Sequence, residues 1–234
     1  MGYDWSLIPR YFPYFLPAAL TTLQLTVAAI AGGILIGLVT ALARLSHRRW
    51  LSTPAALYVW LIRGTPLLLQ LLILYVGIVS LVRLEGFAAA ALAFSVHTGA
   101  YVGEIFRGAI LGVDTGQMEA ARSLGMTYPT AMRLIILPQA FRLAVPPLAN
   151  QFIITLKDSS LASTIAIREL ILQARQMGAS HYRMMEFLII ATLYYLIMTT
   201  VLTVAAHWLE GRLRRSDQNA PQRPAVPQEV ANGD

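Results

Sequence analysis

The sequence EAARSLGMTYPTAMRLIILP, residues 119–138, separates two long apolar runs. Its first residues, Glu-Ala-Ala at 119–121, favour a short helix, and Gly125 falls where a C-terminal cap would end that helix. A second helix is predicted to begin near Thr127, an acceptable N-cap, with Pro129 in its first turn, where no backbone donor is lost. The stretch therefore predicts two short helices joined by a tight turn.

The second of these helices has one largely apolar face. Met132, Ile135, Ile136 and Gln139 fall three or four residues apart on that face, whereas Arg133 lies on another. A helix pair of this kind, projecting from between two apolar runs, presents a surface that another protein must cover.

The composition is that of a membrane protein. Of 234 residues, 56% are hydrophobic and only 13% are charged, which is outside the usual soluble balance. The absence of Cys excludes disulfides, thiol catalysis and Cys-ligated metal, and the four His are not at ligand spacing, so we expect no metal and no cofactor. The net charge of +6 comes from Arg beside apolar runs, which indicates topology and lipid headgroups rather than nucleic acid.

Apolar runs predict an all-α, polytopic protein with about five membrane-spanning helices. Small residues in the first run, Gly32, Gly33 and Gly37, should allow a neighbouring helix to approach closely. The fourth run is interrupted by Lys157 and Asp158. The predicted spans are residues 17–42, 64–82, 86–106, 143–167 and 187–209, with a polar outer segment at 168–186.

Residues 51–62 permit two interpretations. Their aromatic side chains suit an interfacial helix that leads into the second span. The alternative is one longer, kinked helix from Pro54, with Pro66 freeing a carbonyl inside the membrane.

The distribution of Arg predicts the orientation. Ten Arg fall on the predicted inner side (44, 48, 49, 107, 122, 133, 142, 212, 214, 215) and five on the outer side (10, 83, 168, 175, 183). We therefore expect residues 1–16 outside, a membrane domain at 17–211 and a disordered cytoplasmic tail at 212–234. Met1 to Pro17 shows no pattern of a removable signal peptide, and we find no internal repeat.

Four polar residues within apolar runs are candidates for a translocation site. Lys157, the only Lys in the chain, would cost several kcal/mol in the membrane unless it is paired or faces water, and Asp158 beside it needs a partner of its own. His97 and Glu104 are two helical turns apart and share a face. If these residues converge, Glu104 could bind the ammonium and Lys157 the carboxylate of a zwitterionic amino acid.

Each candidate also has a structural interpretation. Lys157 could be a helix-end side chain that reaches the interface, or a member of a structural ion pair. Arg107, three residues after Glu104, could neutralise its carboxylate, and a lone His97 could simply be hydrogen-bonded.

The stretch at 119–138 resembles the signature loop of membrane subunits of binding-protein-dependent ABC importers. It reads E-A-A, three residues, G, nine residues, I, one residue, L-P. In that family the loop lies on the cytoplasmic side between spans three and four and docks into a cleft of the ATPase. The resemblance implies that the coupling loop, about residues 117–140, acts through Glu119, Ala120, Ala121, Gly125, Leu137 and Pro138.

Three further blocks are similar to the polar-amino-acid branch of these permeases, the histidine/glutamine/arginine permease-like family. They are Gly99-Ala100-Tyr101 with Glu104 and Arg107, Arg63-Gly64-Thr65-Pro66, and Lys157 to Leu161. In that branch, Glu and Lys at the positions of Glu104 and Lys157 are associated with translocation. His97 stands where the branch often has Asn, so the substrate preference can differ.

The resemblance implies an ATP-driven amino acid importer in the bacterial inner membrane. The expected partners are a second permease subunit, identical or homologous, two cytoplasmic ATP-binding subunits, an extracytoplasmic solute-binding protein, a polar amino acid and membrane lipid. The sequence has no G-x-x-x-x-G-K-[ST] run, so nucleotide hydrolysis must come from a partner and the chain itself is not an enzyme.

Three rival functions are considered. An intramembrane enzyme would need catalytic residues, but H-E-x-x-H and G-x-S-x-G are absent, and only Ser159 and Ser160 beside Lys157 could form a Ser/Lys pair. A passive channel would not need the signature loop. A permease of the same architecture could also carry another small solute.

Overall fold

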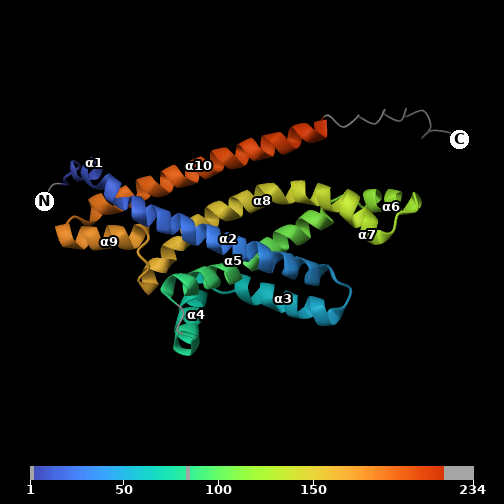
Figure 1. Ribbon diagram of the computed structural model, residues 1–234, viewed down its shortest axis with the longest axis horizontal. Helices are drawn as coiled ribbons and strands as arrows, with labels where there is room; N and C mark the ends of the chain where they lie inside the picture. Colours follow the sequence, from blue (N-terminus) through green and yellow to red (C-terminus); the bar gives the residue numbers. More distant parts are fainter. Residues whose placement is uncertain (1–2, 83–84, 219–234) are drawn as a thin grey trace.

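The computed structural model describes residues 3–82 and 85–218, and every regular element in these ranges is a helix (Figure 1). This confirms the all-α prediction for the described residues. The molecule is elongated: the N-terminal helix α1 and helix α9 lie at one end, and helices α6 and α7 lie at the other.

Within residues 3–82 and 85–218, two helical runs are long and apolar enough to cross a membrane. The first, Leu7–Leu45, comprises α1 (Leu7–Tyr11), the 3-10 turn η1 (Phe12–Phe15) and α2 (Leu16–Leu45). The second, Met184–Arg212, lies within α10 (Met184–Gln218). Both extend beyond the predicted spans. Helix α10 also continues into the predicted tail, whose remainder at 219–234 lies outside the described residues.

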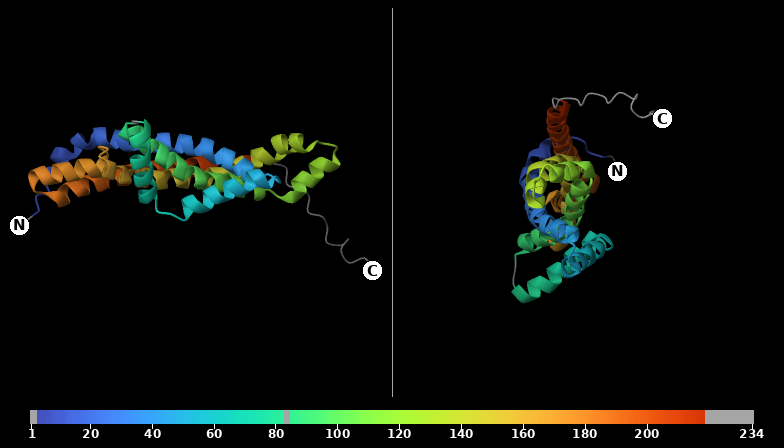
Figure 2. Two further views of the ribbon diagram at one scale, coloured as in Figure 1. Left: turned by 90° about the horizontal axis from the view of Figure 1, so that it is seen from below. Right: turned by 90° about the vertical axis from the view of Figure 1, so that its right-hand side faces the viewer.

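The chain between the first and third predicted spans forms two helices rather than one. Helix α3 (Arg49–Arg63) and helix α4 (Leu67–Val82) meet at an angle of 108°, and together they qualify as a third, bent membrane segment. Figure 2 shows α4 turned across the long axis of the molecule. The break follows from Pro66, which lacks a backbone donor and disfavours helical geometry at the residue before it. The second span was predicted to begin at residue 64, but α4 begins at Leu67.

Helix α5 (Gly86–Leu111) packs along α2 at the centre of the molecule. The glycines of α2 make this close approach possible. A methyl group added at Gly33 would lie 2.7 Å from Thr98 Cγ2, and one added at Gly37 would lie 2.7 Å from Val102 Cγ1. The predicted close helix contact is therefore confirmed, and α5 continues five residues beyond its predicted end at 106.

The fourth span was predicted to begin near Leu143, which lies inside a helical run that begins earlier. Helix α7 (Tyr128–Ala131), the π-helical segment η2 (Met132–Ile136) and α8 (Leu137–Asp158) follow one another without an intervening loop. Pro138 lies in the first turn of α8, directly after the π-helical turn. A π-helical turn shifts the backbone hydrogen bonds locally and so allows the helical run to continue.

The α-helix of the predicted fourth span ends at Asp158, before the predicted end of that span at 167. The apolar residues after Asp158 form a 3-10 segment, η3 (Ser159–Ile165), instead of continuing the α-helix. The Ser159 hydroxyl donates to the Leu156 carbonyl at 2.7 Å, and Ala166 adopts a left-handed conformation with φ of 62° that ends the segment. A local side-chain bond of this kind competes with continued α-helix.

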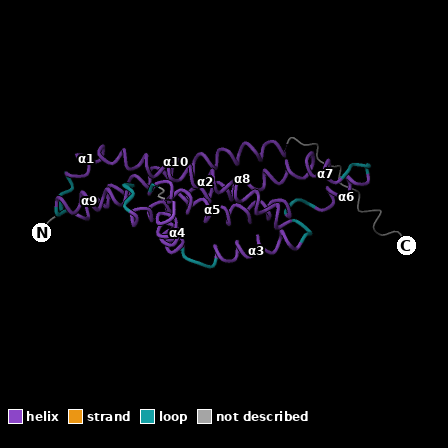
Figure 3. Tube along the Cα trace, turned by 60° about the horizontal axis from the view of Figure 1, so that its bottom comes forward, coloured by secondary structure: helices purple, strands orange, loops and turns teal. Residues whose placement is uncertain are grey.

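The predicted polar outer segment at 168–186 contains a packed helix, α9 (Leu170–His181). It packs against α10 and the first turns of α2, and a short loop joins α9 to α10 (Figure 3). Three of the apolar cores follow one another along the molecule, at the α9 end, in the middle and at the α6 end. The α9 core comprises Phe15, Ala18, Ala19, Leu170, Ala174, Phe187, Ile190, Ala191 and Tyr194.

Candidate coupling surface and translocation site

The turn between α6 (Thr115–Ser123) and α7 is a helix-capping motif built on glycine. Gly125 has φ of +81°, and its N–H donates to the Arg122 carbonyl at 3.0 Å. The Met126 N–H reaches back to the Ala121 carbonyl at 3.1 Å. These are the two hydrogen bonds of a Schellman motif, which needs a left-handed residue at this position. The prediction that Gly125 ends the first helix is confirmed.

The start of the second helix is also as predicted. Thr127 is the N-cap of α7, and Pro129 lies in its first turn. At the other end of the pair, the Asp114 side chain caps α6 by accepting the backbone N–H two residues on at 2.8 Å. Each helix of the pair therefore begins at a residue type that can accept a hydrogen bond from a free backbone N–H of the first helical turn.

The residues expected to couple with an ATPase divide into exposed and buried positions. Ala121 is buried against the rest of the chain, whereas Glu119, Ala120 and Gly125 are exposed. Large apolar side chains of the same segment are exposed too: Leu124 is 84% exposed, and Tyr128, Leu134 and Leu137 are also exposed. Pro138 is exposed at the start of α8. We name this set the coupling surface, and several exposed apolar side chains on one short segment suit contact with another protein.

The coupling surface is fixed to the membrane helices by an apolar core. Ile136 and Ala140 pack with Ala109 and Val113, which lie at the end of α5 and just after it. The α7–η2–α8 run extends without a loop from the coupling surface to Asp158. A displacement of α7 should therefore move α8 as one body.

Glu104 is paired with two arginines. Arg107 Nη2 lies 2.8 Å from Glu104 Oε2, as its spacing predicted, and Arg44 Nε from α2 lies 3.2 Å from Glu104 Oε1. The sequence interpretation missed Arg44, which is 60 residues away. Glu104 therefore links α2 to α5 at the level where α2 ends.

His97 is held by Gln70, a residue that the sequence interpretation missed. Gln70 Nε2 donates to the Ile62 carbonyl at 2.8 Å and to the Thr65 carbonyl at 3.0 Å, so its amide nitrogen faces the α3–α4 break. Its Oε1 must then face His97 Nδ1, at 2.9 Å. Because a carbonyl oxygen only accepts, Nδ1 carries the proton, and in the neutral ring Nε2 is an acceptor.

The end of α3 lies beside the same face of α5. The Arg63 guanidinium stands 5.3 Å from the centre of the Tyr101 ring, which in turn lies 5.0 Å from the His97 ring. The block of residues 63–66 and the block around Tyr101 are therefore neighbours in space, although 38 positions separate Arg63 from Tyr101 in the sequence.

Lys157 and Asp158 end helix α8. Lys157 is exposed and Asp158 is half-buried. Thr98 and Thr155 meet at 3.4 Å between their hydroxyls, and because α5 and α8 run in opposite directions, Lys157 lies near the level of His97 (Figure 1). Glu104 lies seven residues, about 10 Å, farther along α5. Among the described residues, Lys157 forms no hydrogen bond or ion pair with either His97 or Glu104.

A buried carboxylate near α9 was also missed. Glu169 is fully buried and accepts from the N–H groups of Ile171 at 2.9 Å and Leu172 at 2.8 Å, and from the Tyr195 hydroxyl at 3.0 Å. Burial raises the pKa of the Glu169 carboxyl, and these donors act in the opposite direction. Its position directly before an apolar run was a signal for a helix start.

Comparison with known proteins gives one matching family. Residues 33–215 match the family described as the binding-protein-dependent transport system inner membrane component. Among curated relatives, the L-cystine transport system permease protein TcyB of Bacillus subtilis (strain 168) is 41% identical over 214 residues, which cover 90% of this chain and 92% of the relative.

Other relatives are similar over almost their whole length. The glutamine transport system permease protein GlnP of Escherichia coli (strain K12) is 36% identical, covering 92% of this chain and 99% of GlnP. The arginine transport system permease protein ArtQ of Bacillus subtilis (strain 168) is 36% identical, covering 93% of this chain and 100% of ArtQ.

Solved structures share the fold. A crystal structure of an amino acid ABC transporter with histidines contains a chain that is 39% identical, with a TM-score of 0.86, and the match covers 91% of this chain and 100% of that chain. The inward-facing MetNI methionine ABC transporter, at 20% identity and a TM-score of 0.75, shares the fold alone; the match covers 85% of this chain and 95% of that chain.

Proposed function

This chain belongs to the family of inner membrane components of binding-protein-dependent transport systems, and from that premise we propose that it forms the membrane path of an ATP-driven importer for polar amino acids. It is a transport subunit rather than an enzyme. Support for an amino acid as cargo comes from the relatives, which are named for cystine, glutamine and arginine.

The family implies an ATPase and a binding protein as partners. In the proposed assembly, two permease subunits enclose the path, two ATP-binding subunits contact the coupling surfaces, and a binding protein delivers cargo at the α9 end. The coupling surface supports the position of the ATPase, since Glu119, Leu124 and Tyr128 are exposed together at one end of the molecule.

The proposed topology has five membrane segments with the N-terminus outside. The runs at 7–45 and 184–212 provide the first and last, and the bent pair α3–α4 provides the second. Helices α5 and α8, which pack together between the two ends, would provide the third and fourth. The concentration of Arg near the α6 end supports the cytoplasmic location of that end.

The proposed path has polar groups at two depths. His97 and Lys157, with Asp158 beside it, lie nearer the α9 end, and Glu104 lies about 10 Å nearer the coupling surface. The ammonium and carboxylate of one amino acid are only a few ångströms apart. Cargo would therefore meet Lys157 and Glu104 in succession rather than bridge them within one subunit.

The mechanism follows from the unbroken helical run. Closure of the ATPase subunits would press on α6 and α7, and because α7 continues into α8, Lys157 would move with the coupling surface. This alternates access to the path between the two sides. The proposal rests on one observation. The exposed helices α6 and α7 are joined by a turn at Gly125, and α7 continues without a loop into α8, the helix that we propose lines the path.

Uptake into proteoliposomes tests the function. The complete complex, with its ATPase and binding protein, is given ATP and labelled L-cystine, L-glutamine or L-arginine. Wild type should accumulate at least one of them. Glu119→Arg should reduce uptake more than about tenfold, because a reversed charge at a protein contact costs over 1.4 kcal/mol. The control is Glu85→Arg, an exposed acid outside the coupling surface. ATP-driven uptake by Glu119→Arg at the wild-type rate would refute the docking role.

A further inference from the structure

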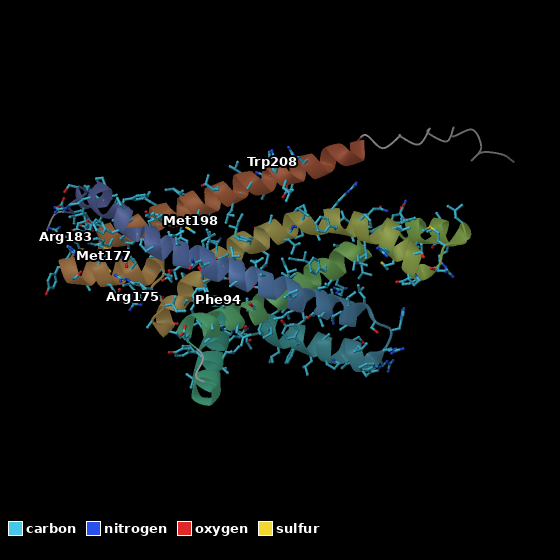
Figure 4. The ribbon with its side chains drawn as sticks, in the orientation of Figure 1. Phe94, Arg175, Met177, Arg183, Met198 and Trp208 are labelled. Atoms are coloured by element: carbon cyan, nitrogen blue, oxygen red, sulfur yellow. The ribbon has the colours of Figure 1, made fainter. Side chains whose placement is uncertain are left out.

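A cavity of about 380 Å³ opens at the α9 end of the molecule, opposite the coupling surface. Its walls come from the first turns of α2 with η1, from α9, and from the short segment before α9. Figure 4 shows Met177, one of the lining residues, on α9 at this end. The lining residues are Tyr14, Pro17, Ala18, Thr21, Arg168, Gln173 and Met177.

Arg168 is the only charged residue of the lining, and a buried glutamine holds it in place. Arg168 Nε donates to Gln173 Oε1 at 2.7 Å. Gln173 is only 6% exposed, and its Nε2 donates to the Tyr14 carbonyl at 3.4 Å, which fixes which end of the amide faces Arg168. The guanidinium is thereby oriented through one nitrogen, and the two terminal nitrogens remain as a planar fork.

This guanidinium lacks a carboxylate partner. Three other arginines of the described residues have one: Arg44 and Arg107 pair with Glu104, and Arg183 pairs with Glu186. Arg168 forms no ion pair in the part of the chain that the structure describes. The adjacent Glu169 does not pair with Arg168, because its carboxylate accepts hydrogen bonds from backbone N–H groups of α9 and from the Tyr195 hydroxyl.

We propose that this cavity is an outer subsite that binds the α-carboxylate of the amino acid cargo through Arg168, oriented by Gln173. The volume falls in the range of small-molecule sites, and an Arg fork matches a carboxylate with two parallel hydrogen bonds. The carboxylate is common to all amino acids, so the subsite recognises the class rather than one side chain. The inference rests on the proposed function and on the outer location of the α9 end.

Protection from an arginine reagent tests the subsite directly. The complete permease–ATPase complex in phosphatidylcholine nanodiscs is treated with phenylglyoxal, and modification at Arg168 and Arg175 is followed by peptide mass spectrometry. Each proteinogenic amino acid and L-cystine is added in turn, and then the α-amide of any that protects. Arg175, exposed on α9 and outside the lining, is the internal control.

At least one free amino acid should slow modification of Arg168 by up to about threefold at twice its Kd, its α-amide should not, and Arg175 should be unaffected. Equal protection by acid and amide, or none by any amino acid, would overturn the subsite. If Arg168 is protected only after the binding protein is added, the cargo carboxylate is bound by that protein. If Arg168 is protected only in nanodiscs of anionic lipid, the anion that it binds is a lipid headgroup. Either result would overturn the proposal.

Three variants separate binding of the carboxylate from a structural role of Arg168. Gln173→Leu keeps the charge of Arg168 but removes its orientation, and should reduce the preference for acid over amide several-fold. In competition for ATP-driven uptake, Arg168→Lys should retain part of the preference for the free acid over the amide and Arg168→Gln should abolish it, with Arg175→Gln as the matched control. If wild type imports amino acids but shows no protection at Arg168, the subsite fails and the proposed function stands. If wild type imports none, the proposed function itself fails.

Discussion

At the scale of single residues, Glu104 shares one carboxylate between Arg44 and Arg107. From the sequence, a structural ion pair and a contact with the substrate were equal alternatives for Glu104. The second ion pair, with Arg44, favours a structural role. Removing the negative charge leaves two guanidinium groups without their counter-charge in a partly buried place.

Glu104→Gln should therefore lower stability as well as transport. We expect a loss on the order of 2 kcal/mol, because hydrogen bonds to charged groups are lost. Thermal unfolding of the purified complex in detergent measures it. Lys157→Met is the comparison, because Lys157 is exposed and its replacement should lower uptake with little change in unfolding temperature. Equal stability of the two variants would contradict the structural role of Glu104.

Gly125 has a left-handed backbone, and this decides the effect of a side chain there. An added Cβ meets nothing within 4 Å, so Gly125→Ala tests backbone strain alone. The turn should be destabilised by about 1 kcal/mol. Amide hydrogen exchange across residues 119–128 should accelerate, and ATP hydrolysis should respond less to cargo. Gly125→Asn, which tolerates this conformation better, should be closer to wild type; the reverse order would contradict the explanation.

At the scale of elements, the α2–α5 contact depends on glycine. A Cβ at Gly37 would lie 2.7 Å from Val102 Cγ1 and 2.9 Å from the backbone nitrogen of Gly103, which cannot move aside easily. Gly37→Ala should destabilise the protein by about 1–3 kcal/mol. The control is Gly108→Ala on α5, where nothing lies within 4 Å. Yield and unfolding temperature measure both, and equal values would show that the helices can separate without cost.

The α3–α4 break depends on Gln70, which binds two carbonyls of the break and His97. Gln70→Leu removes these bonds at once and leaves buried acceptors unpaired, which costs about 1–3 kcal/mol. Hydrogen exchange should accelerate in residues 62–70. Gln24→Leu, an exposed glutamine on α2, is the matched control. Unchanged exchange in Gln70→Leu would mean that Pro66 alone maintains the break.

At the scale of the whole molecule, the two ends should face opposite sides of the membrane. The chain has no Cys, so a single one can be introduced without background. Leu124 on the coupling surface is 84% exposed, and Tyr182 at the end of α9 is 94% exposed. In vesicles that contain the permease without its ATPase subunits, a membrane-impermeant maleimide should react with Tyr182→Cys when they are right-side-out and with Leu124→Cys only when they are inverted. The opposite result would overturn the proposed orientation, and reaction of both in the same vesicles would overturn the five-span topology.

Local chemistry is what the sequence alone could determine. The capping of α6 at Gly125, the start of α7 at Thr127, the close-packing glycines of α2 and the Arg107–Glu104 pair each depend on residues within one or two turns, or on side-chain size alone. A short motif with fixed spacing also predicted the family, and the family match over residues 33–215 confirms it.

Contacts between distant segments were decided only by the tertiary structure. Arg44 meets Glu104, Gln70 meets His97, and Gln173 reaches the carbonyl of Tyr14, across 27 to 159 positions. The joining of α7 to α8, and the packing of α9 where a polar segment was expected, also depend on the surrounding helices. In an apolar interior, each polar group needs a hydrogen-bond partner, and that partner can come from any segment that packs nearby. Sequence spacing does not show which distant segments pack together.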